Sequence, residues 1–504
     1  MSHLAYQKRG PAVELDTDYI VVGTGAGGAA AAVGLARGGM HVTMVEAGAW
    51  RAPSDYPTSM YGQLRDMMDD WGSTLTRGRA MWPVVQGRGV GGTTVINSAI
   101  VVRTPGDIFR LWETEHGVGG DAMADSIWSY QDQIETDLSV EPVPRETMGR
   151  SNALAMQGAK ATGLHNHDML RNVKDCLGKG FCLQGCRAER KQSTALTYVP
   201  EVLERGGDLL SCAPVSRIQI EAGRAVGVEG TFIHPQTRAK GAAFRVRARK
   251  GVLIAASATH SPVLLLRSGI KTPSVGRYFR AHPGAGIFGV FDEPVDMNVG
   301  ATQGWSSTQL RGEYGIKLET LSLPLELVVS RIAGAGPKLM ERLAEYRHFA
   351  MWVFTIRAEA EGRVKAGFGG KPSVNYTLTP YDMERMRIGI HNLTKMGFAA
   401  GAKAVIPGIY GTPYSIGPDQ VDQTLNASLD PRHWTGILSH LFGGCVMGSD
   451  PSRSVCDGRG KVHGLEGLYI ADASCIPTTL GVNPQHTIMA IAMLRAEELL
   501  NDCS

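Results

Sequence analysis

The fold is decided by the stretch Tyr19-Ile20-Val21-Val22-Gly23-Thr24-Gly25-Ala26-Gly27-Gly28. Its first four residues form an apolar run that is typical of a strand buried on both faces. The alanine-rich residues 29–37 favour a helix, and the apolar residues 41–45 favour a second strand, which ends at Glu46. A strand, a glycine-rich turn, a helix, a second strand and an acid in this order predict a dinucleotide-binding βαβ unit.

Each position in the glycine-rich turn has a separate physical task. Gly23 permits the tight turn, and Gly25 allows the backbone to approach a pyrophosphate. Gly28 lets the helix pack closely on the sheet, while the helix N-terminus offers free N–H groups and the positive end of its dipole. Glu46 is placed to accept hydrogen bonds from ribose hydroxyls. The turn alone predicts a dinucleotide and does not separate FAD from NAD.

The overall composition limits the classes of protein to which the chain can belong. At 504 residues it has room for two or three domains, and its 43% hydrophobic and 20% charged residues are ordinary for a globular protein. A net charge of +3 without a block of Lys and Arg argues against a nucleic-acid partner. The sequence shows no secretory signal and no uninterrupted apolar run of about 18 residues, so we expect no transmembrane span and a cytoplasmic location. Export together with a small, signal-bearing partner subunit stays open.

Two other regions carry glycine-rich segments. Residues 87–98 begin with Gly-Arg-Gly-Val-Gly-Gly-Thr-Thr, which suits a backbone laid along a flat ring system. Near the C-terminus, residues 440–448 hold a histidine before a glycine pair, and residues 467–472 favour a strand that ends at an acid. Residues 481–487 then lead into a predicted helix over 488–500.

Together, these motifs resemble those of the glucose–methanol–choline (GMC) oxidoreductase family. The resemblance extends from about residue 18 to residue 500, and residues 252–270 are similar to the family's second signature. It is nearest to the branch of cholesterol oxidases, long-chain alcohol oxidases and gluconate dehydrogenase-like proteins. The resemblance implies FAD as the cofactor and a small-molecule alcohol as the substrate, with oxygen, a quinone or a cytochrome-type protein as the electron acceptor. A dehydrogenase is favoured over an oxidase.

The same resemblance implies an α/β fold in which a Rossmann-like FAD-binding domain is interleaved with a substrate-binding domain built on an antiparallel sheet. The expected FAD-binding domain comprises residues 14–110, 200–285 and 435–504. The expected substrate-binding domain comprises residues 111–199 and 286–434, with the apolar residues 349–356 as a strand at the floor of its pocket. Residues 338–347 predict an amphipathic basic helix, which is either a membrane-facing or substrate-gating lid or a helix packed on the domain.

The resemblance also assigns the residues of the active site. His440 matches the family's active-site histidine in the pattern H-x-x-G-[TG]-C-x-M, where it serves as the base for the substrate hydroxyl. Asn483 matches the partner position that fixes the developing alkoxide, and His486 is a second candidate for that role. The candidate cofactor-binding residues are Gly23, Gly25, Gly28, Glu46, Gly91, Gly92, Thr93, Asn97, Val215, Asp472 and Pro484.

One departure from the family bears on how the cofactor is held. Members with covalently attached FAD carry a histidine at the position where this chain has Ile96, and isoleucine cannot form that bond. We therefore expect dissociable FAD. Two other reactions stay open as alternatives. One is that of a hydroxynitrile lyase, which keeps FAD only structurally, and the other is that of a sterol-type oxidase that also isomerises a double bond.

A cluster of cysteines admits two interpretations. Cys176, Cys182 and Cys186 lie close together in the sequence among glycines, and thiolates at such spacing are suitable ligands for an iron–sulfur cluster. A similar segment in long-chain alcohol oxidases implies no cluster, and three cysteines match no standard four-ligand pattern, so no metal site is assigned. The other cysteines are predicted to be buried thiols, and they are Cys212, Cys445, Cys456, Cys475 and Cys503.

Overall fold

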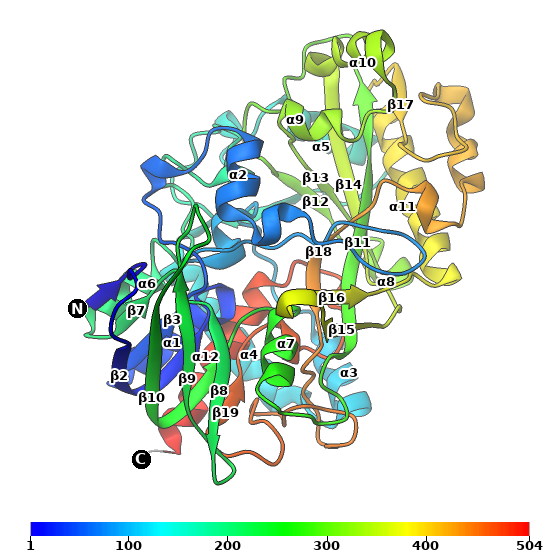
Figure 1. Cartoon of the computed structure of the whole chain (residues 1–504). Helices are drawn as coiled ribbons and strands as arrows, with labels where there is room; N and C mark the ends of the chain where they lie inside the picture. Colours follow the sequence, from blue (N-terminus) through cyan, green and yellow to red (C-terminus); the bar gives the residue numbers. More distant parts are fainter. Residues whose placement is uncertain (1, 503–504) are drawn as a thin grey trace.

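Two β-sheets organise the chain, and the computed structural model describes them within residues 2–502 (Figure 1). The first sheet has the strand order β1, β7, β3, β2, β10, β9, β8, and β19 pairs with β10. Its strands are β1 (Ser2–Leu4), β2 (Val13–Val22), β3 (Val42–Val45), β7 (Asp208–Leu210), β8 (Val215–Glu221), β9 (Arg224–Ile233), β10 (Lys240–Ile254) and β19 (Leu468–Ile470). The pairs from β1 to β10, and the pair β10–β19, are parallel, whereas β10–β9 and β9–β8 are antiparallel. This sheet confirms the Rossmann-like part of the fold prediction.

The predicted βαβ unit forms from β2, α1 (Ala26–Arg37) and β3. The last four residues of β2 are buried, as expected for a strand that is covered on both faces. α1 begins three residues before the predicted range because Gly25 already takes the N-cap position. Its alanines present a smooth surface, and a neighbouring helix can therefore approach its backbone closely.

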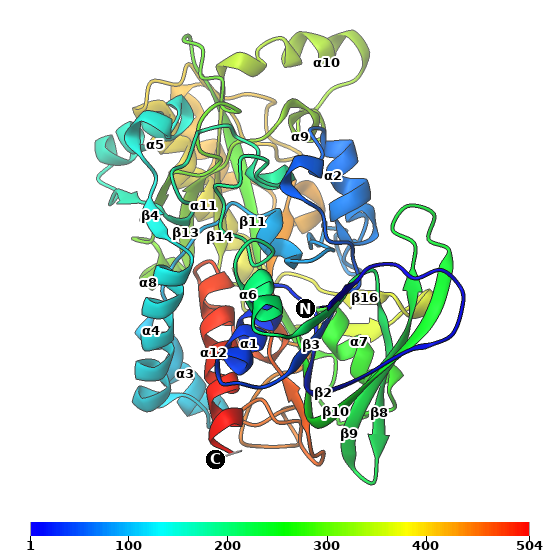
Figure 2. The ribbon, with the colours of Figure 1, turned by 90° about the vertical axis from the view of Figure 1, so that its left-hand side faces the viewer.

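A layer of helices covers one face of the first sheet (Figure 2). α1 packs against α6 (Tyr198–Glu204) and α12 (Gln485–Asn501), and α12 packs in turn against α4 (Gly120–Asp137). The strand β10 pairs with β2 and, at Val252–Ile254, also with β19. Segments from the two ends and the middle of the chain therefore build a single unit.

The second sheet is antiparallel, which confirms the other part of the fold prediction. It has the order β16, β15, β11, β14, β13, β12, β5, and both β17 and β18 pair with β11. The strands are β5 (His167–Asp168), β11 (Arg277–Val290), β12 (Trp305–Ser307), β13 (Ile316–Thr320), β14 (Phe349–Ile356), β15 (Gly362–Ala366), β16 (Pro372–Asn375), β17 (Ala404–Ile406) and β18 (Ile437–Phe442). α11 (Pro380–Ala399) packs on this sheet and on α5 (Arg150–Ala161), and a capping box between Thr379 and Asp382 begins α11.

Shorter elements connect these layers. They are α2 (Met60–Met67), α3 (Gly106–His116), α7 (His260–Arg267), α8 (Arg311–Tyr314), α9 (Leu325–Val329), α10 (Gly336–Leu343) and the two-stranded pair β4 (Val140–Pro142) and β6 (Leu170–Asn172). α10 is the predicted amphipathic helix, and none of its residues is buried, although Leu339 and Leu343 pack partly against the second core. Within residues 2–502 no helix is both long and apolar enough to cross a lipid bilayer.

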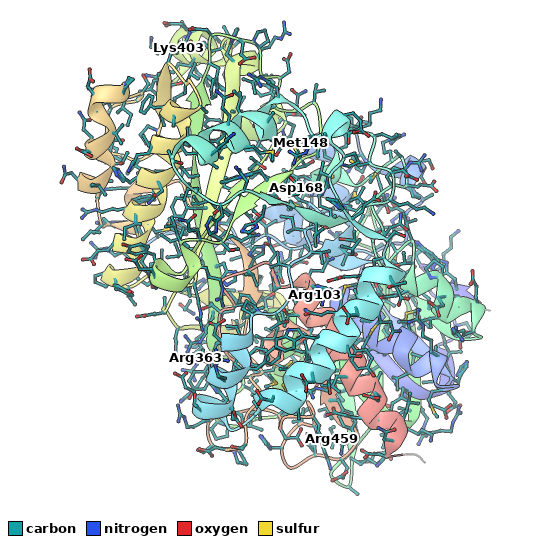
Figure 3. All side chains as sticks on the ribbon, turned by 180° about the vertical axis from the view of Figure 1, so that it is seen from behind. Arg103, Met148, Asp168, Arg363, Lys403 and Arg459 are labelled. Atoms are coloured by element: carbon teal, nitrogen blue, oxygen red, sulfur yellow. The ribbon has the colours of Figure 1, made fainter. Side chains whose placement is uncertain are left out.

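The buried apolar side chains form two large cores, one beside each sheet. α3 and α4 belong to the first core through residues such as Phe109 and Ile127, although the predicted boundary at residue 110 placed α4 in the substrate-binding domain. Figure 3 shows α4 beside α12 near Arg103, with Lys403 at the far end of the molecule. Four of the predicted buried thiols are buried, namely Cys212, Cys445, Cys456 and Cys475, and Cys503 lies outside the described residues.

Candidate active site

A cavity of about 750 Å³ lies between the two sheets and is lined by residues of both. This volume is within the range of small-molecule and cofactor sites. The predicted site residues that line it are Gly23, Gly25, Glu46, Gly92, Thr93, Asn97, Val215, His440, Asp472, Asn483 and Pro484. Gly28, Gly91 and His486 are not among its lining residues.

The N-terminus of α1 opens into this cavity. Gly25, Ala26 and Gly27 line it, and no side chain caps the first turn of the helix, so its N–H groups are free to bind an anion. A Cβ atom on Gly25 would approach only Gly92 Cα, at 4.0 Å, and would otherwise project into open space. The backbone here leaves room for a ligand that carries negative charge.

Gly28 and Gly91 do not line the cavity, but they hold neighbouring segments in place. A Cβ on Gly28 would lie 2.0 Å from Gly23 O, so its absence lets α1 pack on the end of β2. Gly91 has a φ of 92°, which favours glycine, and its N–H donates to Thr24 Oγ1 at 3.1 Å. Gly91 therefore joins the second glycine-rich segment to the first.

Two buried carboxylates hold the loops on the first sheet's side of the cavity. Glu46 accepts hydrogen bonds from Thr24 N at 3.1 Å and from Gly48 N at 2.8 Å. Asp472 accepts from Ser257 N at 2.8 Å and from Ser474 N at 2.8 Å. Burial raises the pKa of both carboxyl groups, and these hydrogen bonds act against that effect.

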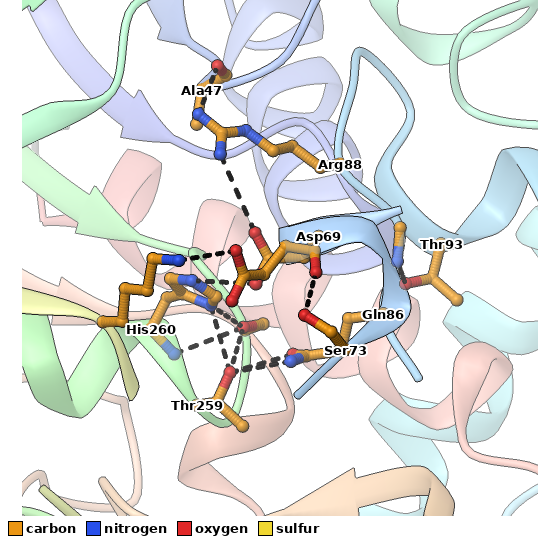
Figure 4. A network of polar contacts seen from close by, with 12 residues as sticks. Ala47, Asp69, Ser73, Gln86, Arg88, Thr93, Thr259 and His260 are labelled. Carbon is orange, nitrogen blue, oxygen red and sulfur yellow. Dashed lines mark hydrogen bonds and ion pairs between the residues drawn. The ribbon is translucent and has the colours of Figure 1, made fainter. Parts of the chain in front are cut away.

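A polar network closes part of the cavity wall (Figure 4). Asp69 lies 3.3 Å from His260 Nε2 and 3.9 Å from Arg88 Nη1, measured from its carboxylate oxygens. Gln86 Nε2 donates to Thr259 Oγ1 at 2.8 Å. The network ties the loop before the second glycine-rich segment to the start of α7, so both hold a fixed position beside the cavity.

His440 lies in β18, opposite His282 of β11 in the register of the second sheet. Its Nε2 is 3.3 Å from Asn483 Nδ2, and its Nδ1 is 3.2 Å from His282 Nδ1. Burial lowers the pKa of His440 to about 4, so the ring is neutral at physiological pH. The predicted residues His440, from β18, and Asn483, from the segment before α12, thus meet at the cavity wall.

His282 is a member of the site that the sequence analysis missed. Gly481 N donates to its Nε2 at 2.9 Å, so a neutral His282 carries its proton on Nδ1, the atom that faces His440. Burial lowers the pKa of His282 well below the usual value. No local motif marks this histidine, because its place depends on how β11 pairs with β18.

Lys317 and Glu319 were also missed. Both are buried in β13, and Lys317 Nζ donates to Glu319 Oε1 and to Asn483 Oδ1. Burial would raise the pKa of Glu319, but Lys317 outweighs it and lowers the pKa. Their spacing of two residues places both side chains on the same face of a strand, and such a charged pair in an apolar strand was the available signal.

His486 does not reach the cavity. Its Nε2 lies 3.1 Å from Gln131 O, and its Nδ1 lies 3.8 Å from Glu135 Oε1, both on α4. Because α12 begins at Gln485, the first helical turn directs His486 toward the neighbouring helix and away from Asn483. The structure therefore gives no support to its role as the second catalytic candidate.

The three cysteines of the 176–186 segment are not arranged as a set of metal ligands in the described structure. Within residues 2–502, no group of three or more His, Cys, Asp or Glu side chains is arranged to hold a metal ion. Cys182 is buried, whereas Cys176 and Cys186 are partly exposed. The iron–sulfur interpretation thus finds no support in the geometry.

Comparison with known proteins gives a consistent result. The GMC oxidoreductase family matches residues 17–284 in its N-terminal part and residues 359–492 in its C-terminal part. A GMC-type oxidoreductase of Sinorhizobium fredii is 32% identical over 494 residues, which cover 98% of this chain and 96% of the relative. A long-chain-alcohol oxidase of Arabidopsis thaliana is 28% identical over 525 residues, covering 95% of this chain and 66% of the relative.

The fold also matches solved structures. Formate oxidase of Aspergillus oryzae superimposes with a TM-score of 0.76 at 16% identity, covering 97% of this chain and 99% of the other. Pyridoxine 4-oxidase from Mesorbium loti gives a TM-score of 0.69 at 18% identity, covering 96% and 99%. The two family matches together span most of the sequence. The chain therefore belongs to the GMC oxidoreductase family.

Proposed function

We propose that this GMC oxidoreductase uses FAD to oxidise a primary or secondary alcohol to an aldehyde or ketone, by hydride transfer to flavin N5. The observation that carries the proposal is the meeting of His440 and Asn483, 3.3 Å apart, in the cavity into which the N-terminus of α1 opens. A long-chain-alcohol oxidase among the relatives supports an alcohol as the substrate.

The described residues fit FAD as the cofactor. The uncapped first turn of α1 suits a pyrophosphate. A side chain at Gly25 would project into the space that this pyrophosphate would fill. Gly92, Thr93 and Asn97 offer a second, flatter wall on the way to the catalytic pair. Bound FAD would supply the acceptor for the hydride, which no side chain can supply.

His440 has the properties of a base for the hydroxyl proton. Its lowered pKa keeps the ring neutral above about pH 4, and only the neutral imidazole has a free nitrogen lone pair that can take a proton. Asn483, anchored at Oδ1 by Lys317, directs its Nδ2–H donor toward the same place. We propose His440 as the base and Asn483 as the donor that stabilises the alkoxide.

The contact with His282 favours a second role for His440. Since His282 presents Nδ1–H, a neutral His440 accepts at Nδ1 and carries its own proton on Nε2. In that tautomer His440 donates to the substrate oxygen, and Asn483 and His440 form two converging donors for an alkoxide. The two roles differ in where the neutral ring carries its proton.

Variants of His440 separate the two roles. His440→Gln keeps an amide donor but cannot act as a base, and His440→Ala removes both functions. If His440 is the base, both variants lose flavin reduction by about 10²–10⁴-fold. If it is a donor, His440→Gln keeps far more activity than His440→Ala. The measurement is the rate of anaerobic flavin bleaching across a panel of sugars, aryl alcohols, aliphatic alcohols and sterols.

The same assay tests the proposed function itself. An alcohol that bleaches the flavin anaerobically supports oxidation, whereas a chain that cleaves cyanohydrins without bleaching would be a lyase of the hydroxynitrile type. Formation of a conjugated ketone from a sterol would instead identify the oxidase that also isomerises. Turnover with oxygen, compared with turnover with a quinone or a dye, distinguishes an oxidase from the favoured dehydrogenase.

We propose that FAD is bound without a covalent link. Ile96 lines the cavity, and its side chain has no nucleophilic atom. The family resemblance matches this position to the histidine that holds FAD covalently in other members. Acid precipitation should therefore release the yellow colour into the supernatant. A yellow pellet that survives washing would contradict the proposal.

A further inference from the structure

Cys182 lies against two buried cations. Arg171 Nη2 donates to Cys182 Sγ at 2.9 Å, and Lys191 Nζ donates to Cys182 O at 2.8 Å. The side chains of Arg171 and Lys191 are only 1% and 2% exposed. Two positive charges are therefore held out of water beside one sulfur.

Buried cations need a compensating negative charge. In the part of the chain that the structure describes, neither Arg171 nor Lys191 forms an ion pair with a carboxylate, and their other partners are neutral carbonyls and a thiol. The free-energy cost of burying an unpaired charge favours ionisation of Cys182. Burial alone would raise the pKa of this thiol, but Arg171 and Lys191 outweigh it and lower the pKa to about 7.

The two cations connect this sulfur to the cofactor pocket. Lys191 Nζ donates to Val95 O and to Asn97 O, the carbonyls on either side of Ile96. Arg171 Nε donates to Ser98 O at 2.9 Å. Residues 96–98 line the cavity, so a change of charge at Cys182 acts on the segment that forms its wall.

A second thiol lies at the other end of the same guanidinium. Arg171 Nη1 is 4.0 Å from Cys176 Sγ, while Nη2 contacts Cys182. Cys176 is partly exposed, and the connecting segment is a surface loop in which Leu177 and Phe181 are 48% and 43% exposed. The two thiols thus share one guanidinium, and Cys176 is the more exposed of the two.

We propose that Cys182 is a peroxide-reactive thiolate, held ionised by Arg171 and Lys191, that forms a disulfide with Cys176 and thereby alters the cofactor pocket. The thiolate attacks hydrogen peroxide, which breaks the O–O bond and gives a sulfenic acid and hydroxide. The thiol of Cys176 then attacks the sulfenic sulfur, and the S–S bond forms as water leaves. The two sulfurs lose two electrons in total, and the peroxide gains them. This site is independent of the proposed alcohol oxidation.

Alkylation of the reduced holoenzyme tests the ionisation. Iodoacetamide labelling from pH 6 to pH 9, followed by peptide mass spectrometry, should show Cys182 reacting with a midpoint near pH 7. At pH 7 we expect it to react about tenfold faster than Cys212, whose pKa is raised by burial. A Cys182 that is unreactive, or that reacts with a midpoint at or above that of an ordinary thiol, would overturn the proposal.

Peroxide treatment tests the disulfide. Wild-type holoenzyme should yield a peptide linked through Cys176 and Cys182, whereas Cys176→Ser should stop at a sulfenic acid that dimedone traps on Cys182. Cys212→Ser is the matched control, and we expect it to behave as the wild type. Formation of the linked peptide should shift the flavin absorption spectrum, and the shift should be absent in Cys182→Ser and Cys176→Ser.

Lys191→Met tests the role of the cations. Loss of one positive charge should move the alkylation midpoint of Cys182 to higher pH, and Arg171→Lys, which keeps the charge, should move it less. If Lys191→Met does not fold, Arg171→Lys and the wild-type profile still decide the question. Iron and acid-labile sulfide in the purified protein would show that the cysteines bind a cluster, which would refute the peroxide-reactive thiolate. An unchanged flavin spectrum after complete disulfide formation would refute the effect of the disulfide on the cofactor pocket.

Discussion

A substitution at Gly25 can distinguish an effect on the backbone from an effect on the space for the cofactor. Its φ of −67° is accessible to any residue, so a side chain there is not strained by the backbone. The added Cβ would meet no protein atom closer than 4.0 Å and would enter the space that we assign to the pyrophosphate. Its effect should therefore fall on the ligand and not on the fold.

We accordingly predict that Gly25→Val lowers FAD affinity at least about tenfold and changes the stability of the apoprotein by less than about 0.5 kcal/mol. Flavin titration and thermal unfolding of the apoprotein provide the two measurements. Gly312→Ala is the matched control, because a Cβ there meets nothing within 4 Å, in α8 and away from the cavity lining. Equal flavin binding by wild type and Gly25→Val would place the pyrophosphate elsewhere.

His440 predicts a pH dependence of flavin reduction. If His440 is the base, the neutral form that it needs persists as pH falls until the pKa of about 4 is approached, whereas a donor at Nε2 keeps its proton at lower pH as well. The rate of anaerobic bleaching should consequently stay level from pH 8 to about pH 5 and fall below that. A decline centred between pH 6 and pH 7, in protein that circular dichroism shows to be folded, would contradict this burial of His440.

The same group contributes to the pH dependence of stability. Its pKa in the folded chain is below the ordinary value of 6.5, so the unfolded chain binds the proton first as pH falls. The contribution is fully present above about pH 6.5 and is lost between about pH 6.5 and pH 4, with a magnitude of about 3 kcal/mol. Urea unfolding of wild type and His440→Asn between pH 5 and pH 7.5 should show a smaller pH slope in the variant.

At the scale of elements, the start of α12 divides the motif of residues 481–487 into a part that faces the cavity and a part that packs on a neighbouring helix. Asn483 stands just before the helix and faces His440, whereas His486 lies in its first turn and faces α4. Asn483 precedes the N-cap residue Pro484, so helical spacing does not fix the direction of its side chain, whereas that of His486 is fixed by the first turn of α12. The motif therefore supplies Asn483, Pro484 and Gln485 to the cavity and His486 to the packing of two helices.

We predict that His486→Leu reduces the free energy of unfolding by about 1–3 kcal/mol and leaves the rate of flavin bleaching within about twofold of the wild type. The physical reason is the loss of the contact between Nε2 and Gln131 O at a buried helix interface. Chemical denaturation and stopped-flow bleaching give the two quantities. A large loss of bleaching in folded protein would return His486 to the catalytic group.

Residues in local sequence motifs could be predicted to belong to the site, whereas residues placed by long-range strand pairing could not. The βαβ unit and the glycine-rich segments could be predicted because each depends on a short local pattern, whereas the roles of His440 and Asn483 come from the resemblance of their motifs to the family. His282, Lys317 and Glu319 could not, because they come from strands of the second sheet whose register is set by pairing over long distances. The contribution of α4 to the first core could not be predicted for a related reason, since its partner α12 lies more than 300 residues away.

At the scale of the whole molecule, the cavity joins the two cores. The first sheet contributes its lining through Val22 and Val45, and the second through Met351 and Val353. A ligand that fills this space contacts both units and binds only when both are folded. Cofactor binding should therefore stabilise the molecule as a whole.

We predict a single unfolding transition for the holoenzyme, with a midpoint that rises with added FAD. At a free concentration of 100 times Kd, the stabilisation should be about 2.7 kcal/mol. Calorimetry with increasing FAD, compared with the Gly25→Val variant at the same concentrations, provides the measurement. Two separate transitions, of which FAD shifts only one, would show that the cavity does not couple the cores.

The pairing of β10 with both β2 and β19 has a consequence for protein synthesis. While the ribosome is translating the middle of the chain, β2 and α1 have already emerged, yet β19 and α12 do not exist. Until these later segments are made, the end of β10 lacks its partner β19 and α1 lacks the packing of α12. The stretch Tyr19–Gly28 therefore gains its full packing only after residues 485–501 have been translated.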